Sequence, residues 1–263
     1  MYEVLSIAAT GLRQQQRRLD VIADNLANVN TAGFKSGRVD FRDALYTAGI
    51  TQEGKPYTPE GSQQKGHGVL IAQITKDMSV GSLQVTGSEL DLAIEGDVYL
   101  SVQTPLEGMK YTKAGNMYIV ADEVDDLQLV TSNGHYILDE EGNFVNVPRD
   151  IESMKIDSDG KITFVAGGEE VEGPYLGVYA FENIYGLSYD GDSLFSQTDA
   201  SGEAYLASFD DFNLRQGALE MSNTSMAQEM QLMIRSQRAF QLASRALTTG
   251  DQMEGLANSM KQG

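Results

Sequence analysis

Few residues in this chain have the types and spacing that catalysis or metal binding requires. Only two histidines occur, His67 and His135, each beside a glycine in a turn-like sequence, and the chain has no cysteine. A protein zinc site needs three or four His, Cys or carboxylate ligands close together. The sequence therefore predicts no metal site, no disulfide and no cysteine nucleophile.

The sequence IDSDGK is the best partial match to a calcium-binding loop, through Asp157, Asp159 and Gly160. When Gly160 takes the sixth position of such a loop, Lys155 falls first and Ala166 twelfth, where carboxylates are needed. The segment is therefore predicted to be a hairpin turn.

Two groups of carboxylates have the density that paired acid and base catalysis would use. They are Asp122, Glu123, Asp125 and Asp126, and Asp139, Glu140 and Glu141. Catalytic carboxylates usually need burial to shift their pKa, and dense acids in turn sequence indicate a solvated rim. No serine-elbow motif, P-loop or dinucleotide fingerprint occurs. The sequence predicts no enzyme and no cofactor.

The chain begins and ends with an amphipathic helical stretch, and these two stretches frame the residues described above. The first is predicted to run from Glu3 to Asn28 or Val29, before Asn30, Thr31 and Gly33 end it. Its apolar seam has coiled-coil spacing, and consists of Leu5, Ala8, Leu12, Gln15, Leu19, Ile22, Leu26 and Val29. Such a seam needs another helix to cover it.

The C-terminal stretch carries two apolar stripes. The first consists of Met226, Met230, Met233, Gln237, Phe240, Ser244 and Leu247, and the second of Leu232, Ala239, Leu242, Ala246, Met253, Leu256 and Met260. Periodicity alone is also compatible with a helical hairpin packed on its own β domain. Because two stripes exceed what one partner helix covers, we expect the terminal helices to pair as a coiled coil and to expose an interaction surface.

Between these ends, short runs of β-branched and aromatic residues alternate with Gly, Asp and Asn, which is typical of an all-β domain. Candidate strands lie in 68–78, 90–96, 98–104, 109–115, 127–134, 135–142, 151–160, 161–167 and 175–183. The predicted fold class is α+β, with a central antiparallel meander or barrel-like domain. The predicted divisions are an N-terminal helix at 1–30, a connecting arm at 31–68, the β domain at 69–212 and a C-terminal helix at 213–263.

Charge divides the chain in the same way. Residues 86–212 hold 26 acidic and 5 basic residues, a formal charge of −21, whereas the two flanks hold 12 acidic and 14 basic residues, a charge of +2. The near-neutral ends can associate without repulsion, and the acidic middle disfavours nucleic acid. No apolar stretch is long enough to span a membrane, and the first residues lack the pattern of a cleaved secretory signal.

Residues 19–41, LDVIADNLANVNTAGFKSGRVDF, closely resemble the N-terminal signature of the bacterial flagellar rod and hook family. The matching residues are Asn25, Leu26, Ala27, Asn28, Thr31, Gly33 and Phe34, whereas Asp24 stands where asparagine is common. The segment SELDLAIEGDVYLSVQTPLEGMKYTKAGNMYI and the C-terminal stretch from Gly217 to Met253 also resemble the family. Length and the linker at 46–68 are most similar to the distal rod type, with the proximal rod and hook types as alternatives.

The resemblance implies a structural subunit whose terminal helices pair in an inner tube, with the β domain outside, for a helical tubular drive shaft of motility. It also implies export through the flagellum's own channel to the extracytoplasmic basal body. Implied partners are other copies and other rod or hook subunits, with the surrounding bushing rings as further candidates. The seams, with Asn25, Asn28, Gly33 and Phe34, form the predicted assembly interface. A different class, a β-domain binding module dimerised by its helices, is the alternative.

Overall fold

The computed structural model describes residues 2–43, 69–104, 108–121 and 127–262, and it divides into two compact units. We call the first the helical unit; it comprises Met1–Ala27, Gly37–Lys76 and Ser225–Gly263. We call the second the β unit; it comprises Asn28–Ser36 and Asp77–Thr224. The predicted divisions at 1–30, 31–68, 69–212 and 213–263 remain a prediction.

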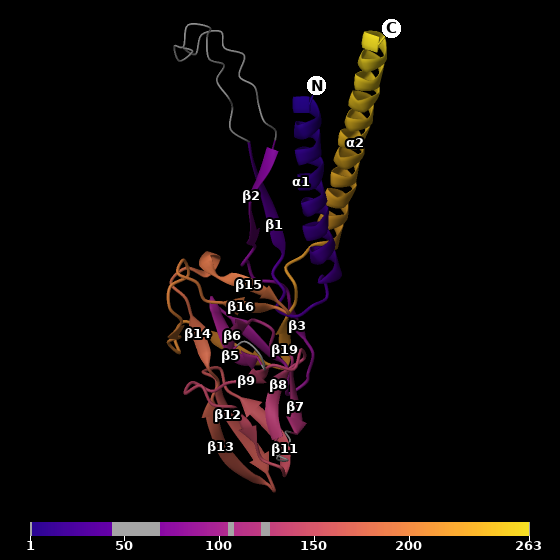
Figure 1. Cartoon of the computed structure of the whole chain (residues 1–263). Helices are drawn as coiled ribbons and strands as arrows, with labels where there is room; N and C mark the ends of the chain where they lie inside the picture. Colours follow the sequence, from indigo (N-terminus) through magenta and orange to yellow (C-terminus); the bar gives the residue numbers. More distant parts are fainter. Residues whose placement is uncertain (1, 44–68, 105–107, 122–126, 263) are drawn as a thin grey trace. The chain divides into compact units, whose positions relative to one another are not determined.

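Two long helices dominate the helical unit: α1 (Tyr2–Ala27) and α2 (Met226–Gln262). They lie side by side and run in opposite directions (Figure 1). The helix α1 ends as predicted, in a turn where the Thr31 amide donates to the Asn28 carbonyl. With 37 residues, α2 is roughly 55 Å long at 1.5 Å per residue and outruns the 26 residues of α1.

A hairpin completes the helical unit. Strand β1 (Gly37–Asp43) pairs antiparallel with β2 (Val69–Lys76), and a register shift lies between Asp40 and Phe41. The sequence predicted the 68–78 strand but assigned it to the β domain, and it predicted no strand at β1. The partner of β2 lies in the segment that the sequence reading took as a connecting arm.

The β unit consists of many short antiparallel strands (Figure 1). They are β3 (Leu83–Val85), β4 (Leu92–Glu95), β5 (Val98–Thr104), β6 (Gly108–Thr112), β7 (Met117–Ala121), β8 (Leu127–Thr131), β9 (Tyr136–Ile137), β10 (Asn146–Val147), β11 (Ile151–Ile156), β12 (Lys161–Ala166), β13 (Glu169–Tyr175), β14 (Val178–Ala180), β15 (Ser188–Gly191), β16 (Leu194–Ser196), β17 (Tyr205–Leu206), β18 (Asn213–Gln216) and β19 (Ala218–Glu220), with a 3-10 helix η1 (Ile184–Gly186). All nine strands predicted from the sequence overlap an observed strand.

The largest sheet is open. Its main path runs β10-β8-β9-β5-β6-β16-β15, with β14 and β17 branching from β5 and β7 pairing with β8. Separate small sheets contain β11-β12-β13, β18-β4 and β19-β3. The barrel-like prediction is therefore wrong, whereas the antiparallel α+β class is confirmed. Closure needs strands long enough to keep pairing around a ring, and several of these have only two or three residues.

Two apolar clusters form the core of the β unit. The larger includes Leu92, Leu100, Leu129, Ile137, Ile162 and Phe164, and the other gathers Met78, Tyr99, Tyr111, Phe181 and Phe195. The rings of Tyr111 and Phe181 meet edge to face, with their centroids 4.9 Å apart. Such contacts supply the burial that stabilises a domain without disulfides.

A buried ion pair anchors the first segment of the β unit. Lys35 Nζ lies 2.7 Å from Glu220 Oε1 and donates to the Ser79 carbonyl at 2.9 Å, while the Gly81 amide donates to the same carboxylate oxygen. Both side chains are about 1% exposed. Removing either partner would leave a buried charge unpaired, so residues 28–36 are held firmly within this unit.

Candidate assembly interface

The predicted seam of α1 faces the interior of the helical unit. Ile22 is 3% exposed, and Leu12, Leu19 and Leu26 are half-buried. The side chain of Leu5 lies outside the described residues. Since α1 packs against both α2 and the β1–β2 hairpin, this face is covered mainly by the chain itself.

Asn25 joins three elements of the helical unit. It is 1% exposed; its Nδ2 donates to the Gly37 carbonyl at 2.9 Å, and its Oδ1 accepts from the Gly37 amide at 2.7 Å. The Asn25 amide also lies near the Glu229 carboxylate in the first turn of α2, where it acts to lower the pKa of that carboxyl. One amide side chain thus connects the end of α1, the start of β1 and the start of α2, and only an asparagine or glutamine carries both a donor and an acceptor in this form.

Glu229 is the acidic member of this junction. Partial burial raises the pKa of its carboxyl, although the hydrogen bond from Asn25 and the charge of Arg18 oppose the shift. Its Oε2 is shielded from solvent and has no hydrogen-bond partner among the described residues. An acid in the first turn of a helix is favoured by the helix dipole, so the position suits α2 despite the partial burial.

Asp24, the departure from the family signature, has a partner on the hairpin. Lys76 Nζ of β2 lies 3.8 Å from Asp24 Oδ2. Burial lowers the pKa of Lys76, and the charge of Asp24 opposes that shift. Aspartate at position 24, where the signature commonly has asparagine, thus adds an ion pair between α1 and the hairpin.

The inward face of α2 combines residues from both predicted stripes. Leu232, Met233, Phe240 and Leu247 are half-buried, and Ser236, which belongs to neither stripe, is 1% exposed. These positions repeat by three and four along the helix, as a seam against α1 requires. The face that meets α1 therefore lies between the two predicted stripes and takes residues from both.

The remaining large apolar residues of the stripes are exposed on α2. Near its start these are Met226 and Met230, joined by Ile234, which the sequence reading left out. In its second half they are Leu242, Met253, Leu256 and Met260, and Met260 is 79% exposed. Several large apolar side chains exposed on one helix are typical of a surface that binds another chain.

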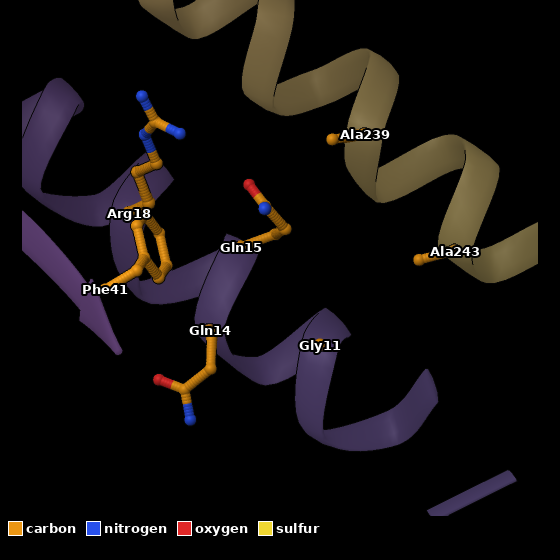
Figure 2. A pocket seen from close by; sticks show the side chains of 7 residues that line it. All are labelled: Gly11, Gln14, Gln15, Arg18, Phe41, Ala239 and Ala243. Atoms are coloured by element: carbon orange, nitrogen blue, oxygen red, sulfur yellow. The ribbon is translucent and has the colours of Figure 1, made fainter. Parts of the chain in front are cut away.

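A hollow of about 350 Å³ opens between α1, β1 and α2, all within the helical unit. It is lined by Gly11, Gln14, Gln15, Arg18, Phe41, Ala239 and Ala243. In Figure 2, Ala239 and Ala243 point from α2 toward α1, and Arg18 lies over the ring of Phe41, with its guanidinium carbon 5.4 Å from the ring centroid. The hollow exists because glycine and alanine occupy positions where larger side chains would fill it.

Three residues of the predicted interface belong to the β unit instead. Phe34 is 1% exposed and meets Tyr189 edge to face, and Gly33 has a φ of +68° with no room for a side chain. Asn28 is half-buried at the start of this unit. Within the subunit, Gly33 and Phe34 are therefore internal, and the signature specifies local packing there; their place in the assembly interface remains a prediction.

The polar residues considered above for metal binding or catalysis lie in turns or in buried positions of the β unit, where the structure describes them. Asp157–Gly160 forms the predicted hairpin turn between β11 and β12, with the Gly160 amide donating to the Asp157 carbonyl. Asp139, read as part of a solvated rim, is instead buried and accepts from the Glu141 and Asn143 amides. His135, read as a turn residue, is half-buried. His67 and the acids of 122–126 lie outside the described residues.

Within the described residues, no three His, Asp or Glu side chains come together as metal ligands would. Within the same part of the chain, no helix combines the length and apolar character of a membrane span. A paired-helix unit with unpartnered apolar faces, joined in one chain to an acidic β unit, is typical of a self-assembling structural subunit.

Comparison with known proteins agrees with this class. Residues 5–35 match the family description "flagella basal body rod protein", 93–164 match "flagellar hook protein FlgE/F/G D1 domain", and 215–260 match "flagellar basal body rod FlgEFG protein C-terminal". Flagellar basal-body rod protein FlgG of Bacillus subtilis is 37% identical over 260 residues, which cover 96% of this chain and 97% of that protein.

Two further relatives match over nearly their whole length. Flagellar basal-body rod protein FlgG of Borreliella burgdorferi is 37% identical, covering 100% of both chains. Flagellar hook-basal body complex protein FlhP of Bacillus subtilis is 34% identical, covering 99% of this chain and 100% of that protein. The chain belongs to the flagellar basal-body rod protein family. It is a structural subunit of the rod, and the predicted distal rod type is confirmed.

Proposed function

We propose that this rod subunit polymerises through its helical unit into a helical tube, with α1 and α2 paired as a coiled coil in each subunit. The observation that supports this most strongly is the row of exposed apolar side chains on α2, from Met226 to Met260, in a near-neutral part of the chain. Burying them on a neighbour would release water from a large apolar area, which drives association.

The acidic middle of the chain suits the opposite role. Its charge of −21 makes close packing of β units against one another costly, and it favours solvated positions outside the tube. Support for this arrangement comes from the family resemblance together with the charge division. Partners are further copies and other rod or hook subunits, the bushing rings are a further candidate, and export through the flagellar channel follows the same resemblance.

The test uses two separate variants, each with a glutamate in place of one exposed apolar residue, the first in the helical unit and the second in the β unit. Leu256→Glu on α2 is expected to prevent polymer formation, because each added subunit would have to bury a carboxylate without a partner. Val85→Glu is the matched control, since Val85 is exposed in the β unit. Sedimentation velocity and electron microscopy of the whole chain measure polymer for the wild type and for both variants.

The outcomes separate the two classes of function. Tubes or stacked polymers from the wild type and from Val85→Glu, but not from Leu256→Glu, support the proposal. Discrete dimers at every concentration would favour a binding module dimerised by its helices. Polymers that survive Leu256→Glu and fail with Val85→Glu would place the assembly contact on the β unit.

A further inference from the structure

The methionines of this chain are concentrated on α2, and they are most exposed there. Of the 11 methionines, five lie on this helix. Met233 is half-buried, and the other four are between 46% and 79% exposed: Met226, Met230, Met253 and Met260. We call these four the α2 methionines, and they are the four most exposed methionines of the described residues.

The methionines of the β unit are mostly buried. Met78, Met117 and Met154 are no more than 8% exposed and belong to its apolar clusters. Met221 is half-buried, and Met109, at 43%, is the one exposed methionine of this unit. Among the described residues, an oxidant dissolved in water therefore reaches one exposed thioether in the β unit and four in the helical unit.

The α2 methionines belong to two groups of exposed apolar side chains. Within each group the residues are three or four apart, so they are neighbours on the helix surface. The groups are Met226, Met230 and Ile234, and Met253, Leu256 and Met260. Two of the three side chains in each group carry a thioether, so a reaction at sulfur changes most of the apolar surface of the group.

We propose that the α2 methionines are an oxidation site that controls assembly, with a peroxide as the oxidant. A lone pair of the thioether sulfur attacks one oxygen of hydrogen peroxide, the O–O bond breaks, and the other oxygen leaves as hydroxide. The proton left on the transferred oxygen passes to this hydroxide, which gives a sulfoxide and one molecule of water. Sulfur loses two electrons and the peroxide gains them. Since the chain has no cysteine, methionine supplies its only sulfur atoms.

The effect on assembly rests on the proposed polymerisation through exposed apolar residues of α2. Oxidation converts a flexible apolar side chain into a polar, chiral one. A sulfoxide oxygen accepts hydrogen bonds from water, and burying it in an apolar contact without a donor is costly. Oxidation of the free subunit therefore opposes association. The same contact, once formed, shields the sulfur atoms from peroxide, so the site acts before assembly and not after it.

The oxidation is reversible by enzymes. Methionine sulfoxide reductases restore the thioether, one enzyme for each sulfoxide epimer. A dithiol supplies the two electrons and becomes a disulfide, and the sulfoxide oxygen leaves as water. Because the chain has no cysteine, neither the peroxide nor the dithiol makes or breaks a disulfide within it. Loss and recovery of polymer therefore report the state of the methionines.

The first measurement maps oxidation along the whole chain. The free subunit is treated with hydrogen peroxide for increasing times, and peptide mass spectrometry gives the rate at each methionine. The α2 methionines and Met109 are expected to react first, because their side chains are exposed. Met233 should react more slowly than Met230 on the same helix, and Met78, Met117 and Met154 last.

The second measurement follows polymer by sedimentation. The oxidised wild type is expected to need about a tenfold higher concentration to polymerise, equivalent to roughly 1.4 kcal/mol, and to recover after treatment with both reductases and dithiothreitol. Far-UV circular dichroism verifies that the oxidised chain keeps its helices.

Leucine variants separate the α2 methionines from the rest of the chain. Leucine keeps the size and apolar character of methionine but has no sulfur. One chain that carries Met226→Leu, Met230→Leu, Met253→Leu and Met260→Leu is expected to polymerise equally well with and without peroxide. Met109→Leu is the matched control, since it makes the same exchange at an exposed position of the β unit, and it should stay as sensitive as the wild type.

The inference and the proposed function fail in different ways. Normal polymerisation of a chain whose α2 methionines are fully oxidised would overturn the inference and leave the proposed function intact. A fourfold leucine variant that is as sensitive to peroxide as the wild type would also overturn it, as would buried methionines that react as fast as the α2 methionines. A wild-type chain that never polymerises before oxidation would overturn the proposed function and, with it, the control of assembly.

Discussion

Asn25→Ala should destabilise the helical unit while leaving the β unit unchanged. The substitution removes two hydrogen bonds with Gly37, of 2.9 and 2.7 Å, and an amide that helps to keep the pKa of Glu229 from rising further. A typical hydrogen bond contributes about 0.5–1.5 kcal/mol net, so the loss of the two bonds to Gly37 amounts to about 1–3 kcal/mol. That is a substantial part of the stability of an ordinary domain, which is roughly 5–15 kcal/mol.

Urea unfolding followed by circular dichroism at 222 nm measures this loss, because both long helices lie in the helical unit. The near-UV signal of the buried Tyr99 and Tyr111 reports the β unit separately. Gln16→Ala is the matched control: it removes an exposed hydrogen bond to Asp20 on the same helix, which is expected to cost no more than about 0.5 kcal/mol.

Asn25→Asp sharpens the test. Aspartate keeps the acceptor for the Gly37 amide but cannot donate to the Gly37 carbonyl, and it places a second carboxylate beside Glu229. Because like charges raise each other's pKa, stability should be lost as the pH rises above the ordinary glutamate value of 4.5 and regained on acidification. A loss for Asn25→Ala no larger than that of Gln16→Ala would refute the reasoning.

Three further predictions follow from buried residues. Leu26→Asp should abolish assembly without unfolding the β unit, as an aspartate on the covered face of α1 costs a few kcal/mol; sedimentation and near-UV circular dichroism measure both. Burial, aided by the charge of Lys35, lowers the pKa of Lys113 from 10.5 to about 8. Between these two pH values the unfolded chain holds a proton on Lys113 that the folded β unit does not, so the free energy of unfolding of the β unit should rise from pH 8 to about 10. Urea titrations should show no such rise for Lys113→Met. Gly33→Ala should cost the β unit about 2–5 kcal/mol by the same titration, since a Cβ there would lie 2.5 Å from the Ala114 amide nitrogen.

Periodic patterns predicted the long elements correctly. The seam of α1 and the nine candidate strands depend on local residue types, and these determined the observed elements. Sequence left the inward face of α2 open between two stripes, because nearly every register of that helix offers apolar residues and only the position of α1 selects among them. The barrel-like prediction failed because strand pairing is non-local.

The contacts that build the candidate interface could not be read from one sequence. Asn25 meets Gly37 and Glu229 only after the hairpin and both helices have packed, and the hollow exists only where Gly11 faces Ala239 and Ala243. One signal was available: small residues four apart on α2, in a stretch otherwise rich in large side chains, indicate close approach of another element. The packing of Gly33 and Phe34 inside the β unit was not predictable, because a signature marks which residues are specified and not which unit they pack in.

Electron cryo-microscopy of polymers grown from the purified whole chain tests the central claim most directly. The account predicts helical polymers in which α1 and α2 of each subunit form the continuous contact with neighbours, with the acidic β units on the outside. Polymers held together by contacts between β units, with the apolar faces of α2 left uncovered, would contradict it.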